Sequence, residues 1–280
     1  MEAQQLRGEY FNRIRSREIA EAHFVAELSN TPDIILTSMK SYDPLRTTVV
    51  VPEASGRLGM VCCTTREQQR AFYATSRSRS HIVNVDVFTS VGSDWYGFVH
   101  GVVTTEALET SERFTSELLG ILPATADEDT IAGEIGLGWP LGLGKMGDAA
   151  GEPALERVAT LKAHNAWLDA FRLGDPESIA RLYTDEAQFA VRSAVDGEIS
   201  SVEGRAAIAG YYGNLLARAK VTSVDVVMRI VDRWFVFTEL VVGIDHPSRG
   251  PTVARMADVC VMSTDDRIMV HLGTAPDPNE

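Results

Sequence analysis

The sequence predicts two tandem copies of one α+β domain, and a repeat, the chain length and the order of elements all point to it. Ten residues between Arg66 and Val103 match residues of the same or a similar type in 205–242, without a gap, at an offset of 139 positions. A repeat of about 140 residues has the size of a domain, because solenoid units recur every 20 to 50 residues or so. The 280 residues also suffice for two separate cores. We therefore expect domains at 1–148 and 149–280.

The second copy shows the order of elements more clearly. Apolar residues three and four positions apart over 154–173 predict a long amphipathic helix, which Gly174 ends. Asp175 and Pro176 are residue types that begin helices, so a short helix is expected up to Tyr183. The remaining predicted elements are a strand at 187–191, a third helix at 204–219, and strands at 221–231, 234–244, 253–263 and 267–273. Helices followed by a meander of strands favour an antiparallel sheet that wraps the first helix.

The first copy is expected to follow this order with changes. Its predicted elements are helices at 13–29, 32–35 and 65–78 and strands at 81–89 and 94–106. A loop through Asp43-Pro44 and 52–56 adds length. Beyond 106 the copies diverge, because 109–121 has a helical pattern, 125–130 is typical of an acidic loop, and the glycine-rich stretch 136–147 is typical of a linker. Without two closing strands, this domain is either incomplete or completed by the second.

Charge and cysteine content exclude several classes of protein. The 26 basic and 39 acidic residues give a net charge of -13, which repels nucleic acid and anionic membrane surfaces. The three cysteines form neither a disulfide framework nor a zinc-ligand spacing, and there is no dinucleotide fingerprint, so we expect no metal and no cofactor. The chain has no apolar run of about 18 residues and no secretion signal. These features predict a cytoplasmic protein with no membrane partner.

Three segments of the second copy resemble the nuclear transport factor 2-like superfamily, which includes ketosteroid isomerase and the SnoaL-like polyketide cyclases. They are AFRLGDPESIARLYTDEAQF, SVEGRAAIAGYYGNLL and ADVCVMSTDDRI. The likeness covers residues 155–275 and, through the repeat, residues 10–106. It implies two cone-shaped α+β-barrel (cystatin-like) domains, each a long helix wrapped by a curved antiparallel sheet, with a pocket inside the cone. The superfamily also contains proteins without catalysis, so the fold does not name a reaction.

In the second domain the resemblance places the oxyanion-hole aspartate of ketosteroid isomerase on Asp258, its tyrosine on Trp167 and its base aspartate on Val191. Since two of these three residues are apolar here, steroid isomerase chemistry is not expected. Asp258, Glu239 and His271 form a candidate acid–base cluster if strand parity brings them to one face, with Trp167 as a substrate contact. The alternative is that Asp258 has a structural hydrogen bond while the other two face solvent or a partner subunit.

In the first domain two histidines stand where the second copy has other residues. His23 lies in the first helix and His100 in the strand WYGFVHGVV. Asp43, before Pro44, resembles the base of the isomerase family. A base and an orienting carboxylate would suit proton abstraction, with Tyr42 and Tyr96 as substrate contacts. We expect the working pocket in this domain, built from His23, Asp43 and His100. The alternative is that the histidines are core or interface residues and that Asp43 begins a turn.

These observations favour a cofactor-independent lyase or isomerase that uses acid–base chemistry on a hydrophobic, aromatic or polycyclic small molecule. Two alternatives remain. One is a non-catalytic small-molecule-binding or accessory protein, and the other is an epoxide hydrolase that holds a water between Asp258 and Glu239. The two copies are expected to pack through their sheets as an internal pseudo-dimer, and further homo-oligomerisation stays open.

Overall fold

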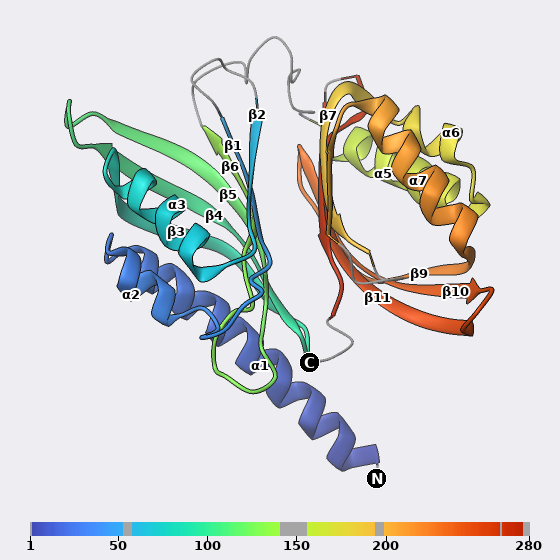
Figure 1. The fold of residues 1–280 in the computed structure, drawn as a ribbon, viewed down its shortest axis with the longest axis horizontal. Helices are drawn as coiled ribbons and strands as arrows, with labels where there is room; N and C mark the ends of the chain where they lie inside the picture. The colour runs from blue at the N-terminus through green and yellow to red at the C-terminus, as the bar shows by residue number, and fades with distance from the viewer. Residues whose placement is uncertain (1, 53–57, 141–155, 194–198, 264, 277–280) are drawn as a thin grey trace. The chain divides into compact units, whose positions relative to one another are not determined.

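A computed structural model describes residues 2–52, 58–140, 156–193, 199–263 and 265–276, which divide into two compact units. The first unit contains the elements from α1 to β6 and the second those from α5 to β12 (Figure 1). Each unit is a six-stranded sheet with helices. None of the helices in these ranges has the length and apolar character needed to cross a membrane.

The first unit begins with a long helix that packs against the two long strands β3 and β4. Its elements are α1 (Glu2–Glu27), α2 (Pro32–Thr37), β1 (Thr47–Pro52), β2 (Leu58–Cys63), α3 (Arg66–Arg77), β3 (Ser80–Gly92), β4 (Tyr96–Ala107), β5 (Arg113–Pro123) and β6 (Ile135–Pro140). The strand order is β2-β1-β6-β5-β4-β3. β1 pairs with β6 in parallel, and β6, β5, β4 and β3 pair antiparallel in sequence. The sheet stays open.

The second unit has the same topology. Its elements are α5 (Arg157–Leu173), α6 (Pro176–Ala180), β7 (Tyr183–Arg192), β8 (Ile199–Glu203), α7 (Arg205–Arg218), β9 (Lys220–Val231), β10 (Phe235–His246), β11 (Gly250–Met262) and β12 (Ile268–Thr274). The strand order is β8-β7-β12-β11-β10-β9, again with one parallel pair, β12 with β7. The two tandem copies and the α+β class that the sequence predicts are therefore present.

Local sequence explains where the helices begin and end. Gly174 ends α5 in the left-handed conformation, with φ 66°, which costs glycine little. Asp175 then caps α6 by accepting from the backbone N–H of Glu177, and Pro176 occupies its first turn. Thr65 begins α3 with a capping box, in which its side chain and that of Gln68 each accept a backbone N–H.

Strand alternation sends one set of side chains toward the helices in each unit. In the second unit this inner face and α5 share a core of aromatic and aliphatic residues that includes Trp167, Phe171, Phe189 and Tyr212. In the first unit the corresponding core contains Ile19, Phe24, Tyr73 and Val99.

Ladder register makes individual positions of the two sheets equivalent. Across β4, β5 and β6 the partners are Val99, Gly120 and Gly136. Across β10, β11 and β12 they are Thr238, Asp258 and Gly273. Asp258 thus stands where the first unit has Gly120. Two residues earlier along the last strand, His271 stands where the first unit has Glu134. The two units therefore present different polar groups from the same frame.

Several predictions about the first unit are wrong. Residues 109–121 are not helical, because most of them lie in β5, and the first unit does have both closing strands. The expected linker begins inside β6, and its part from 141 onward lies outside the described residues. The extra length after α2 is not only loop, since it contains β1 and β2. The pattern also missed β8 in the second unit.

Candidate active site in the second unit

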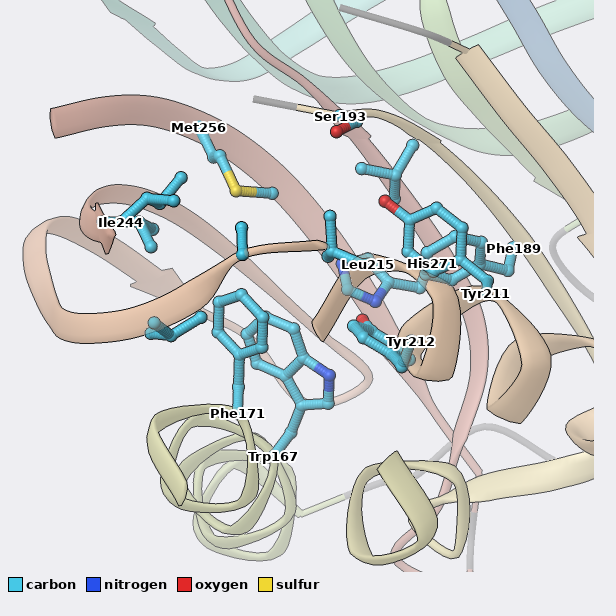
Figure 2. Close-up of a pocket in the computed structure, with 14 residues that line it drawn as sticks. Trp167, Phe171, Phe189, Ser193, Tyr211, Tyr212, Leu215, Ile244, Met256 and His271 are labelled. Atoms are coloured by element: carbon cyan, nitrogen blue, oxygen red, sulfur yellow. The ribbon is translucent and has the colours of Figure 1, made fainter. Parts of the chain in front are cut away.

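A cavity lies between α5, α7 and the inner face of the second sheet (Figure 2). It contains about 510 Å³ of space, including space open to solvent, and nearly all of its walls are apolar. Its lining residues are Trp167, Phe171, Phe189, Val191, Ser193, Tyr211, Tyr212, Leu215, Ala219, Val221, Val242, Ile244, Met256 and His271. Such a site suits a hydrophobic ligand that is oriented by a few polar groups.

His271 is the only imidazole among these lining residues, and three aromatic side chains pack around its ring. It lies on β12 and is 1% exposed. Tyr183 stacks on it with an interplanar angle of 11°, and Trp167 and Phe189 present their rings at 83° and 80°. Nδ1 lies 2.6 Å from the hydroxyl of Tyr183. A ring fixed in this way presents its other nitrogen, Nε2, in one direction.

Asp258 is the carboxylate that Nε2 of His271 faces, at 3.8 Å from Oδ2. Asp258 is fully buried on β11, and neither of its oxygens has a hydrogen-bond partner among the described residues. The same holds for Nε2 of His271. Gly273 makes room for this carboxylate, because a Cβ there would lie 3.2 Å from that of Asp258. A buried carboxylate without partners is costly, which marks the pair as a functional candidate.

A second histidine lies near this pair. His164, on α5, is fully buried, and its Nε2 lies 3.2 Å from the hydroxyl of Thr238. Burial lowers the pKa of His164 to about 4, although the charge of Asp258 acts in the opposite direction. His164 is therefore neutral at pH 7.

Two tyrosines lie on the Nδ1 side of His271 and extend its hydrogen bonding. The hydroxyls of Tyr183 and Tyr212 lie 3.2 Å apart, and both side chains are buried. Burial raises the pKa of each phenol well above its usual range, so both remain protonated donors near neutral pH. His271, Tyr183 and Tyr212 thus form a hydrogen-bonded row, Asp258 faces the His271 end of it, and His271 and Tyr212 reach the cavity wall.

Residues 164–271 match the protein-family model described as "SnoaL-like domain". The second unit is a SnoaL-like domain. With the repeated topology, the chain contains two tandem copies of the nuclear transport factor 2-like fold. No curated protein matches the chain in a sequence comparison.

Solved structures similar to this chain include three that each cover less than half of it. A hypothetical protein with a ketosteroid isomerase-like fold from Catenulispora acidiphila, in complex with trimethylamine, is 19% identical over 42% of this chain and 86% of its own, with a TM-score of 0.36. An epoxide hydrolase of M. tuberculosis described as LEH-like is 17% identical over 42% and 84%, with a TM-score of 0.36. A ketosteroid isomerase-like protein from Erwinia carotovora atroseptica is 14% identical over 43% and 96%, with a TM-score of 0.35.

Of the residues predicted for the SnoaL-like domain, the structure brings Asp258, His271 and Trp167 together, but not Glu239. Thr238 pairs with Asp258 across the ladder, so Glu239 points to the opposite face of the sheet. There its Oε1 accepts a hydrogen bond from Arg255 at 2.6 Å. The carboxylate pair expected for an epoxide hydrolase is therefore not formed.

The residues predicted for the first unit do not converge. His23 is buried under the sheet, whereas His100 lies on its other face, since the neighbouring Val99 belongs to the core around α1. His100 faces Glu117, with Nε2 3.8 Å from Oε2. The side chain of Asp43 accepts the backbone N–H of Arg66 at the start of α3.

The two tyrosines predicted as substrate contacts in the first unit also lie apart. Tyr42 is 40% exposed, and its hydroxyl donates to Asp127. Tyr96 is buried on the same face of β4 as His100. The proposed combination of His23, Asp43 and His100 is therefore not a single site in this structure.

Sequence reasoning missed His164, Tyr183 and Tyr212. A signal for His164 was available, because residues 164, 167 and 171 share one face of a helix. Tyr183 had no such signal, since it was placed at the end of a helix and in fact begins β7.

Proposed function

We propose that this protein is a cofactor-independent lyase or isomerase whose reaction takes place in the cavity of the SnoaL-like domain. The observation that carries the proposal is the buried carboxylate of Asp258 and Nε2 of His271, 3.8 Å apart and without hydrogen-bond partners among the described residues, with His271 at the wall of an aromatic cavity. The substrate class that fits these walls is a hydrophobic aromatic or polycyclic molecule with one polar group.

The geometry supports a division of acid and base roles. Nε2 of His271, at the cavity wall, and Oδ2 of Asp258, buried beside it, lie 3.8 Å apart and are too distant to bond each other. Asp258 takes a proton from a carbon next to a carbonyl group, and His271 donates a hydrogen bond or a proton to the developing oxyanion.

Charge favours the tautomer that this role needs. If Nε2 of His271 lacked a proton, its lone pair would face the carboxylate of Asp258, so Nε2–H is preferred. Nδ1 then accepts from the hydroxyl of Tyr183, which can in turn accept from Tyr212. The two tyrosines hold the imidazole in this state, and the proton that Asp258 removes from the substrate carbon returns to the substrate when the reaction ends.

An exchange assay tests this proposal without knowledge of the natural substrate. Bicyclic aromatic ketones such as 2-tetralone exchange the protons next to the carbonyl with D₂O when a base acts on them, and NMR follows the rate. We expect the protein to accelerate this exchange and Asp258→Asn to reduce the acceleration by about 10²- to 10⁴-fold. His271→Gln should also reduce it, through the lost donor.

Glu239→Gln is the matched control, because this carboxylate is one residue from the ladder partner of Asp258 but on the other face of the sheet. It should retain the exchange rate. If the ketones and 2-naphthol bind in the cavity but exchange is no faster than in buffer, the protein is a binding protein. Equal loss in the Glu239 and Asp258 variants would contradict the assigned roles.

A further inference from the structure

The first unit contains a buried polar cluster that the proposed reaction does not use. His23 and Glu27 lie one turn apart on α1, and Glu134 lies just before β6, where the second unit has His271. All three residues are buried, with side-chain exposed fractions of 0%, 11% and 10%. Nε2 of His23 lies 3.9 Å from Oε1 of Glu27 and 3.9 Å from Oε2 of Glu134.

Hydrogen bonding fixes which nitrogen of His23 carries the proton. The hydroxyl of Ser38 lies 2.6 Å from the carbonyl oxygen of Ile35 and donates its one hydrogen there. The same oxygen lies 2.8 Å from Nδ1 of His23, so Nδ1–H is the donor in that contact. In the neutral ring, Nε2 therefore has a lone pair, and it has no hydrogen-bond partner among the described residues.

The lone pair of His23 and two carboxylate oxygens consequently face one point, and their mutual repulsion is relieved by a proton or by a metal cation that lies among them. Neighbouring groups neutralise it only in part. Arg77 pairs with Oε2 of Glu27, the oxygen that points away from His23. Tyr73 is a neutral donor to Glu134, at 3.3 Å.

We propose that the first unit binds a divalent first-row metal ion of the Zn²⁺ type. Its ligands are Nε2 of His23, Oε1 of Glu27 and Oε2 of Glu134. One imidazole and two carboxylates are a ligand set that suits Zn²⁺, whose catalytic sites keep three protein ligands and one open position. The bond from Nδ1 to Ser38 is the outer contact that orients a metal-binding histidine.

The surroundings of the cluster provide access and fix its position. Glu27 and Glu134 line a cavity of about 810 Å³, including space open to solvent, through which an ion and a fourth ligand can enter. The backbone of Glu134 is held by β1, because its N–H donates to the hydroxyl of Thr47 and its carbonyl accepts from Thr48.

Metal binding by tag-free, chelator-treated protein tests this inference. Titration with Zn²⁺ by calorimetry should show a single equivalent bound, and Co²⁺ should give the intense visible absorption of a four- or five-coordinate ion. His23→Gln and Glu134→Gln should abolish both signals. Ser38→Ala should weaken binding by about 10- to 100-fold, because it removes only the orienting contact.

A second cluster in the chain, formed by His164, Asp258 and Cys260, provides the control. Cys260→Ala should leave Zn²⁺ affinity unchanged, and circular dichroism should show that every variant is folded. If wild-type protein binds no stoichiometric Zn²⁺ or Co²⁺, a proton neutralises the cluster and the inference is wrong. Binding that survives His23→Gln and is lost in Cys260→Ala would also overturn it.

Discussion

Replacing His164 with glutamine should reduce the amount by which the free energy of unfolding falls as the pH is lowered. His164 is fully buried, and its pKa falls from 6.5 to about 4 on folding because burial disfavours the imidazolium. Between these values the unfolded chain binds more protons than the folded one. The stability that comes from neutral His164 is therefore fully present well above pH 6.5 and is lost as the pH falls through 6.5 to about 4.

The size of this effect follows from the shift. One pH unit of difference corresponds to about 1.4 kcal/mol, so the separation between 6.5 and about 4 is worth about 3 kcal/mol in the free energy of unfolding. Most of it, about 2 kcal/mol, is lost between about pH 7.5 and about pH 5. Glutamine is neutral throughout, and its amide can replace the contact between Nε2 and Thr238.

Urea denaturation of wild type and His164→Gln at several pH values measures this difference. Trp167 reports on the site by fluorescence, because its ring centroid lies 5.8 Å from that of His164. The quantity to compare is the change of unfolding free energy with pH, in which any intrinsic cost of the substitution cancels. His246→Gln, at the half-buried end of β10, is the matched control and should keep the wild-type slope.

Two results would refute this reasoning. One is an equal acid slope in wild type and His164→Gln. The other is an NMR titration in which His164 of the folded protein gains its proton near 6.5, the ordinary value. Either result would mean that water or a neighbouring charge stabilises the imidazolium of His164, so that its surroundings are less apolar than the structure indicates.

Further substitutions test other parts of the structure. Gly133→Ala should destabilise the first unit by about 1–3 kcal/mol in urea denaturation, because its Cβ would overlap the backbone of Arg46, whereas Gly138→Ala, with open space around it, should be near neutral. Thr65→Ala should cost about 1 kcal/mol through the lost cap of α3, and an unchanged urea midpoint would contradict the capping box. Tyr183→Phe should cost about 1–3 kcal/mol and slow ketone exchange, because it leaves Nδ1 of His271 without its partner; unchanged exchange would remove this tyrosine from the mechanism.

Much of the fold was predictable because local signals agreed with the tertiary structure. Gly174, Asp175 and Pro176 each act within a few residues of their own position, so the end of α5 and the start of α6 follow from them directly. The ungapped repeat likewise predicted that α3, β3 and β4 would recur as α7, β9 and β10.

The strands that the sequence analysis missed depend on distant partners. Residues 109–121 carry a helical pattern, but most of them form β5 because β4 and β6 pair with both of its edges. Strand preference depends on such neighbours more than on the segment itself. β1 and β2 were hidden for the same reason, since β1 pairs with β6, far along the chain.

The sequence by itself determined the fold class, the tandem repeat and the types of residue from which a site can be built. Which of those residues meet was decided only by tertiary structure. Glu239 and Asp258 were expected as a pair, but the ladder sets Thr238 opposite Asp258 and turns Glu239 to the other face, since a shift of one residue in a strand reverses the side. Nε2 of His23 and Oε2 of Glu134 lie 3.9 Å apart although more than a hundred residues separate them, because only the folded sheet, in which β6 pairs with β1 and β5, brings Glu134 to the helix.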